Sequence, residues 1–243
     1  MEKKKWVIKD PKDFMCGNVH YQINGNKYYR VTKVKSIINN EGLNIYRAKS
    51  DYDEATKYMH ARGKLGTTVH NLFQKILEGK DVDIEKFEEE IKEDILLFQD
   101  FKMNCNLQAE SLEQHVWSEK MGTAGTIDFI GWYQSNSEYL PTTGRGKYKE
   151  HVESKFPELS HVIGDWKTSP KIYNDFWIQL ASYVFTFEEQ TGIKLDGGFI
   201  ARFRDNKLVV EEKTYEELKP YIILFKHCIP LLEFTKNILP RVK

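Results

Sequence analysis

Asp165 and Lys167 are the residues whose types and spacing most directly suggest chemistry. They extend the apolar run at 161–163, which predicts a β-strand, and residues two apart in a strand point to the same face. A carboxylate and an ammonium group therefore share one patch, while Trp166 between them points into the opposite layer. On its own, an Asp-x-Lys pair is better explained as an ion pair at the end of a strand.

The residues that follow favour a catalytic site instead. A Ser-Pro dipeptide ends the strand, and a helix is expected from about residue 175. This helix carries Gln179 and Tyr183 four residues apart, and therefore on one face.

Asp128 adds a second carboxylate from a neighbouring strand. We expect strands at 112–118 and 125–133, and in the second of them Ile127 and Phe129 should face one side and Asp128 the other. An unpaired charge buried in a strand costs several kcal/mol. The sequence therefore predicts a cationic group close to Asp128.

Carboxylates, a lysine and an imidazole together suggest a metal centre that hydrolyses phosphodiesters. Oxygen-rich ligand sets suit Mg²⁺ or Mn²⁺, as one ion or two, and a metal-bound water beside a lysine can attack phosphorus. Without a cysteine pair, zinc is not expected. His70, taken alone, would be a boundary histidine beside the apolar stripe of a helix at 65–77. The candidate residues on strands are Glu113, Asp128, Asp165 and Lys167, and those on helices are His70, Gln179 and Tyr183.

Composition sets the class of protein. Of the 243 residues, 36 are basic and 36 acidic, so the chain has no overall basic signature, although a neutral protein can still carry a basic groove. Cys16, Cys105 and Cys228 are widely separated, which predicts a reducing compartment with no disulfide framework and no four-cysteine iron–sulfur cluster. The sequence shows no apolar run of membrane-span length, and we expect no signal or transit peptide. A cytoplasmic protein of a prokaryotic or virus-infected cell, without membrane partners, is expected.

The chain divides into an N-terminal annex and a core. The annex, 1–62, combines a hairpin at 19–31 with a polar helix at 44–61, and Arg62-Gly63-Lys64 is expected to separate that helix from the next. The core, 63–243, carries a polar insertion at 134–159 and ends in a long helix.

Four strings resemble the RecB-type branch of the PD-(D/E)XK nucleases, and look most like the mitochondrial genome maintenance exonuclease group and its phage and bacterial relatives. They are GTTVH, GTAGTID, VIGDWKTS and QLASY, and the resemblance spans roughly residues 28 to 235. It implies an α/β fold with an αβββαβ restriction-endonuclease-like core, in which a mixed central sheet is flanked by helices, and an N-terminal helical annex. The absence of four cysteines and the length of the insertion depart from related branches.

The resemblance also implies roles for individual residues. Asp128, Asp165, the carbonyl of Trp166 and His70 would bind metal, Lys167 would polarise the attacking water, and Gln179 with Tyr183 would fix the site and the DNA backbone. Glu113 lies where related chains carry an upstream acid, with Glu110 and Glu119 as rivals. Expected DNA contacts are Arg62, Lys64 and the helix start at Thr67, then Lys171, Arg202 and Arg204 at the mouth, with Tyr173 and Trp177 stacking on bases.

The expected activity is a Mg²⁺- or Mn²⁺-dependent deoxyribonuclease in DNA replication, repair or recombination. A single-strand exonuclease is favoured, with DNA that is single-stranded or has a free end as its substrate and replication or repair proteins as partners. Two alternatives stay open at this point. They are a structure-selective endonuclease and a protein that binds DNA on a nuclease fold without cutting it.

Overall fold

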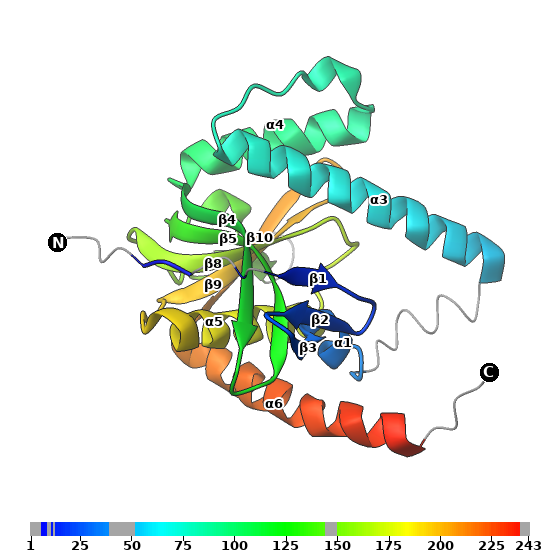
Figure 1. Ribbon diagram of the computed structural model, residues 1–243. Helices are drawn as coiled ribbons and strands as arrows, with labels where there is room; N and C mark the ends of the chain where they lie inside the picture. Colours follow the sequence, from blue (N-terminus) through cyan, green and yellow to red (C-terminus); the bar gives the residue numbers. More distant parts are fainter. Residues whose placement is uncertain (1–5, 9–10, 12, 39–51, 144–149, 239–243) are drawn as a thin grey trace.

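The computed structural model describes residues 6–8, 11, 13–38, 52–143 and 150–238. Its elements form a main sheet with helices on both faces and a separate two-stranded sheet, β6 with β7 (Figure 1). The strands are β1 (Phe14–Cys16), β2 (His20–Ile23), β3 (Asn26–Arg30), β4 (Gln108–Ser118), β5 (Thr123–Tyr133), β6 (Thr142–Thr143), β7 (Glu150–His151), β8 (Ser160–Lys167), β9 (Gly197–Phe203) and β10 (Leu208–Thr214). The helices are α1 (Val31–Lys35), α3 (Tyr52–Leu77), α4 (Glu89–Asn104), α5 (Asn174–Thr191) and α6 (Tyr215–Ile238), with short 3₁₀ turns η1 (Ile84–Lys86) and η2 (Ser137–Tyr139).

The main sheet has eight strands in the order β1-β2-β3-β5-β8-β9-β10, with β4 paired to β5 off this path. The pairs β3/β5 and β8/β9 are parallel and the others are antiparallel. The expected α/β class is therefore confirmed as a mixed α/β fold. The predicted hairpin is also present, because β2 and β3 flank Asn24 and Gly25, whose φ values of 50° and 83° suit a tight hairpin turn.

Two hydrophobic clusters cover the two faces of the sheet. The first packs α1, α5 and α6 against the sheet, and the second packs α3 and α4 against the opposite face (Figure 1). Ile127 lies in the first cluster with Ile130, whereas Phe129 lies in the second. The expectation that Ile127 and Phe129 share a face is wrong, because regular alternation is interrupted here. The interruption lies opposite Glu113, which has a φ of 49° and leaves the β4/β5 ladder.

Helix α3 is continuous across the break that the sequence suggests. Residues 62–64 lie within it, so the division between annex and core falls inside a helix, and the expected helix start at Thr67 is wrong. A glycine inside a helix costs only about 1 kcal/mol, which tertiary packing can outweigh. Gly66 allows this packing, because a Cβ there would lie 3.2 Å from Thr168 Oγ1. Of the helix expected at 44–61, residues 44–51 lie outside the described residues, and 52–61 form the first part of α3.

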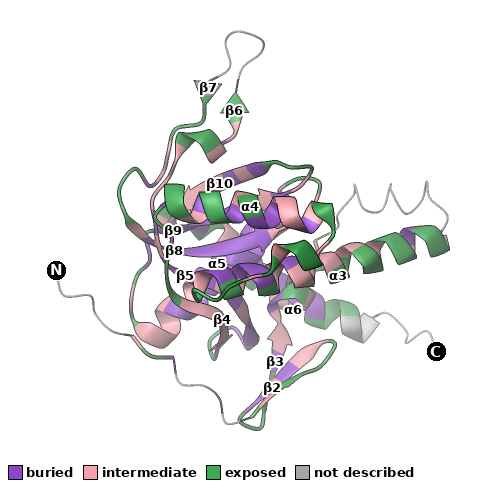
Figure 2. Ribbon diagram, turned by 90° about the horizontal axis from the view of Figure 1, so that it is seen from above, coloured by how far each residue is buried: buried purple, intermediate pink, exposed green. Residues whose placement is uncertain are grey.

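The insertion at 134–159 is anchored at its base and projects at its tip. Glu212 accepts hydrogen bonds from the Tyr133 and Ser135 hydroxyls at 2.5 and 2.6 Å and from the Lys155 amide at 2.8 Å. Strands β6 and β7 extend away from the body of the protein (Figure 2). None of the helices in the described part of the chain has the length and hydropathy of a membrane span.

Candidate metal centre

The site lies where β5 and β8 part. The ladder between these strands ends at the pair Phe129 and Gly164, and the next residue on each strand is an aspartate, Asp128 and Asp165. From there β8 continues its pairing with β9. The amide of Trp166 donates a hydrogen bond to Asp128 Oδ2 at 3.1 Å across the opening. The diverging strands thus direct two carboxylates toward one gap.

Three side chains at this gap are close enough to share a cation. Ligand atoms of His70, Glu113 and Asp128 all lie within 4.8 Å of one another, and His70 Nδ1 is 3.4 Å from Asp128 Oδ2. His70 reaches the gap from α3, which is anchored by its buried neighbours Val69 and Phe73. The structure therefore brings together residues from one helix and two strands, and the most distant two, His70 and Asp128, are 58 positions apart in the sequence.

The surroundings of the three upstream acids, Glu110, Glu113 and Glu119, distinguish the one that lies at the gap. Glu110 accepts hydrogen bonds from the indoles of Trp6 and Trp132, each at 2.7 Å, and Glu119 accepts one from Tyr28 at 2.6 Å. Neither acid belongs to the group of possible ligands around Asp128 in the described part of the chain. Glu113 is the upstream acid at the gap.

The acids at the gap repel one another. Burial and the charges of Asp128 and Asp165 raise the pKa of Glu113 to about 7. Burial also raises the pKa of Asp128, and Asp165 adds to this effect, although His70 and Lys167 oppose it. An array of buried, mutually repelling oxygen ligands is the environment that a divalent cation stabilises. The residues present therefore fit a metal ion, and they do not identify which one.

Lys167 forms an ion pair with Asp165, whose side chain is 4% exposed. Burial alone would lower the pKa of Lys167, but the carboxylates of Asp165 and Asp128 outweigh burial and raise it. The ammonium group therefore stays charged at neutral pH. Trp166, as expected from strand alternation, packs into the opposite layer among phenylalanine rings.

Tyr183 reaches the gap from α5 and lies directly on Gly125. A Cβ at Gly125 would lie 2.6 Å from the Tyr183 hydroxyl oxygen, so a larger residue could not occupy that position. Burial and the charges of Asp128 and Asp165 raise the pKa of Tyr183, which keeps the hydroxyl protonated as a donor. Gln179, one turn earlier on α5, is 9% exposed.

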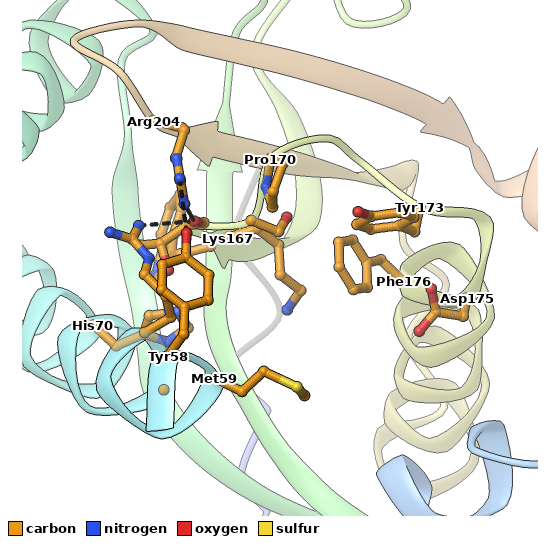
Figure 3. Close-up of a pocket in the computed structure, with 14 residues that line it drawn as sticks. Tyr58, Met59, His70, Lys167, Pro170, Tyr173, Asp175, Phe176 and Arg204 are labelled. Carbon is orange, nitrogen blue, oxygen red and sulfur yellow. Dashed lines mark hydrogen bonds between the residues drawn. The ribbon is translucent and has the colours of Figure 1, made fainter. Parts of the chain in front are cut away.

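A pocket of about 660 Å³ opens beside Lys167, between α3 and the start of α5 (Figure 3). Arg62 and Arg204 converge at one end, and both donate to the carbonyl of Thr168, at 3.2 and 3.5 Å. Arg204 also donates to the Tyr58 hydroxyl at 3.3 Å. The remaining lining residues include Met59, His70, Pro170, Tyr173, Asp175 and Phe176.

Some of the predicted DNA contacts line this pocket and others do not. Arg62, Tyr173 and Arg204 line the pocket. Lys64 and Thr67 line a separate hollow on α3, and the exposed Lys171 covers the Tyr173 ring, with 5.1 Å from its Nζ to the ring centroid. Arg202 pairs in the sheet with Lys167 and is not among the residues that line the pocket.

Trp177 does not fit its predicted role of base stacking. It is 2% exposed and belongs to the hydrophobic cluster under α5, and Lys213 covers its ring. The physical reason is the orientation of α5, which turns this face of its first turn toward the core. Phe176, the preceding residue, faces the pocket instead.

Tyr58, Asp175 and Phe176 are among the pocket residues that the sequence analysis did not predict, and Lys35, which pairs with Asp175, was not predicted either. Tyr58 lies four residues before Arg62 on α3, a spacing that could have suggested a shared face. No sequence signal connects Lys35 with the site.

Comparisons with known proteins leave the family of this chain open. No protein-family model matches the sequence, and no curated protein matches it. Among solved structures, the crystal structure of SSO0001 aligns with 87% of this chain and 76% of that chain, at 14% sequence identity and a TM-score of 0.37. A likeness of this strength carries no argument about activity.

Proposed function

We propose that this protein is a metal-dependent nuclease with a PD-(D/E)XK core. The observation that carries the proposal is the convergence of His70, Glu113 and Asp128 at the gap where two strands part, with the Asp165–Lys167 pair beside them. The chain order α4, β4, β5, β8, α5, β9 supports the αβββαβ arrangement. The pairing of β8 with β9 is parallel, and β4, β5 and β8 form an antiparallel meander.

The chain's own groups have distinct tasks in phosphodiester hydrolysis. A divalent ion bound here would act as a Lewis acid toward water and phosphate. The Lys167 ammonium would offset the negative charge that develops on the phosphate oxygens. Asp165 holds that ammonium at the gap, and the protonated Tyr183 hydroxyl can donate a hydrogen bond to the substrate backbone. The arrangement supports cleavage with Mg²⁺ or Mn²⁺.

The pocket favours a single strand as the substrate. Tyr58, Tyr173 and Phe176 offer aromatic faces to a base, and stacking requires that the base is unpaired. Arg62 and Arg204 add guanidinium groups that suit phosphates. We further propose that the nucleic acid is DNA and that the protein cuts it from a free end. The proposal includes a role in DNA replication or repair and a cytoplasmic location.

The test is cleavage of labelled linear single-stranded DNA with Mg²⁺ or Mn²⁺. We expect Lys167→Ala and Asp165→Asn to lower the rate by roughly a thousandfold or more, because each removes charge from the reacting centre. Lys86→Ala, which changes an exposed lysine in η1, should cleave like the wild type. Circular dichroism should show the same fold in all variants.

Three outcomes would redirect the proposal. Full activity in either active-site variant would remove the assignment of the site. Cleavage of circular single-stranded DNA at the rate of the linear strand would replace the exonuclease with an endonuclease. Binding of DNA without cleavage in any divalent metal would favour a recruitment protein.

A further inference from the structure

We infer that Lys35, from the N-terminal part of the chain, is a positioning residue that keeps the Lys167 ammonium on Asp165 by occupying the competing carboxylate of Asp175. The inference deepens the proposed function and rests on it, since Lys167 is the group being positioned. Nothing in the sequence pattern suggested this residue.

The short helix α1 delivers Lys35 to the interior. Val31 and Val34 are 1% and 0% exposed and anchor α1 in the cluster beneath α5 and α6. Lys35 lies four residues after Val31, one helical turn, and therefore points toward the same side. Its side chain is 14% exposed. A lysine buried to this degree needs a compensating charge.

Asp175, at the start of α5, supplies that charge. Lys35 Nζ lies 3.0 Å from Asp175 Oδ2. The neighbouring Phe176 ring is covered by two ammonium groups, with 4.9 Å from Lys35 Nζ and 5.1 Å from Lys167 Nζ to its centroid. Both ammonium groups therefore lie against the same aromatic ring, which favours each of them through a cation–π contact.

The pKa of Lys35 and the pKa of Lys167 both depend on charged groups that the two lysines share. Burial and the charge of Lys167 lower the pKa of Lys35, and Asp175 counteracts this. Asp175 also contributes to the raised pKa of Lys167, although burial opposes the increase and Asp165 and Asp128 contribute more. Asp175 is thus an alternative partner for Lys167. As long as Lys35 neutralises Asp175, moving Lys167 from Asp165 to Asp175 would gain little electrostatic free energy.

Loss of the Lys35 charge should redirect Lys167. Asp175 would become an uncompensated carboxylate at the pocket wall, next to the Phe176 ring that already contacts Lys167 (Figure 3). The ammonium would then move toward Asp175 and away from the reacting phosphate. Lys35 is not among the residues lining the pocket, so substrate binding should change little.

The experiment measures kcat and KM on single-stranded DNA for three variants of the full chain. We expect Lys35→Met to lower kcat roughly tenfold or more with KM within about threefold of the wild type, a size typical of coupled charged neighbours. Lys35→Arg, which keeps the charge, should retain most of kcat. The double variant Lys35→Met/Asp175→Asn should recover most of the loss, because the competing carboxylate is gone.

The outcomes separate this inference from the proposed function. An unchanged kcat in Lys35→Met, or a double variant as slow as the single one, overturns the role of Lys35 while leaving an inactive Lys167→Ala as support for the nuclease. Activity in Lys167→Ala would instead overturn the proposed function. A crystal structure of Lys35→Met decides the point without any assay. Lys167 beside Asp175 supports the inference, and Lys167 still paired with Asp165 overturns it.

Discussion

Glu110 and Glu113 lie three residues apart on β4, yet their surroundings are opposite. The Glu110 carboxylate accepts hydrogen bonds from two indoles at 2.7 Å and lies 3.1 Å from His161 Nε2. Within the described part of the chain, Glu113 receives no hydrogen bond or ion pair of this kind and instead faces Asp128. Burial alone would raise the pKa of Glu110, but these partners lower it, whereas the pKa of Glu113 is raised to about 7.

Both glutamates interrupt the β4/β5 ladder, in different ways. The register shifts between Ala109 and Ser111, with Glu110 as the extra residue. Glu113 has a φ of 49°, an uncommon conformation for a residue other than glycine. Such backbone strain often marks functional positions. A carboxylate whose hydrogen bonds are supplied by the protein stabilises the fold, whereas a carboxylate without such partners is available to a ligand.

The largest expected contrast is in cleavage. Asp128→Asn and Glu113→Gln should lower the rate of single-strand cleavage, Asp128→Asn by roughly a thousandfold or more, because each removes an oxygen ligand charge from the candidate metal centre. Glu110→Gln should keep the rate but lower the unfolding free energy by about 1–2 kcal/mol, since its hydrogen bonds to a charged acceptor weaken. Equal rate losses at Glu110 and Glu113 would erase the distinction.

The second expected contrast between the surroundings of Glu110 and those of Glu113 is in metal binding. Mn²⁺ at about a hundred times its dissociation constant should stabilise the wild type by about 2.7 kcal/mol, because only the folded chain assembles the site. Differential scanning fluorimetry should show the same upward shift in Tm for Glu110→Gln and little or none for Asp128→Asn. A shift that survives in Asp128→Asn would place the cation elsewhere.

A further contrast is a pH dependence of stability without metal. The pKa of Glu113 is raised in the folded chain from 4.5 to about 7, so the folded state binds this proton more tightly than the unfolded state. The stabilisation is fully present below pH 4.5 and is lost as the pH rises toward 7. Urea unfolding in EDTA should show this decline, and Glu113→Gln should reduce it. Glu110→Gln should leave the decline in place.

Local patterns in the sequence predicted the elements that carry the site. The apolar run at 161–163 and the Ser-Pro break predicted β8 and the start of α5, and turn residues predicted the hairpin of β2 and β3. These features follow from nearest-neighbour chemistry, so they are readable without the fold. The continuity of α3 across Gly63 was missed because packing of Gly66 against Thr168 outweighs the local signal.

By itself the sequence determined that Asp165 and Lys167 share a strand face, and that Asp128, His70 and Tyr183 lie on neighbouring elements. Which upstream glutamate joins them, the burial of Trp177 in the core and the pairing of Lys35 with Asp175 became visible in the folded chain alone. The physical reason is that strand and helix periodicity is fixed by a few adjacent residues. A carboxylate's partners are fixed by side chains that arrive from distant parts of the chain.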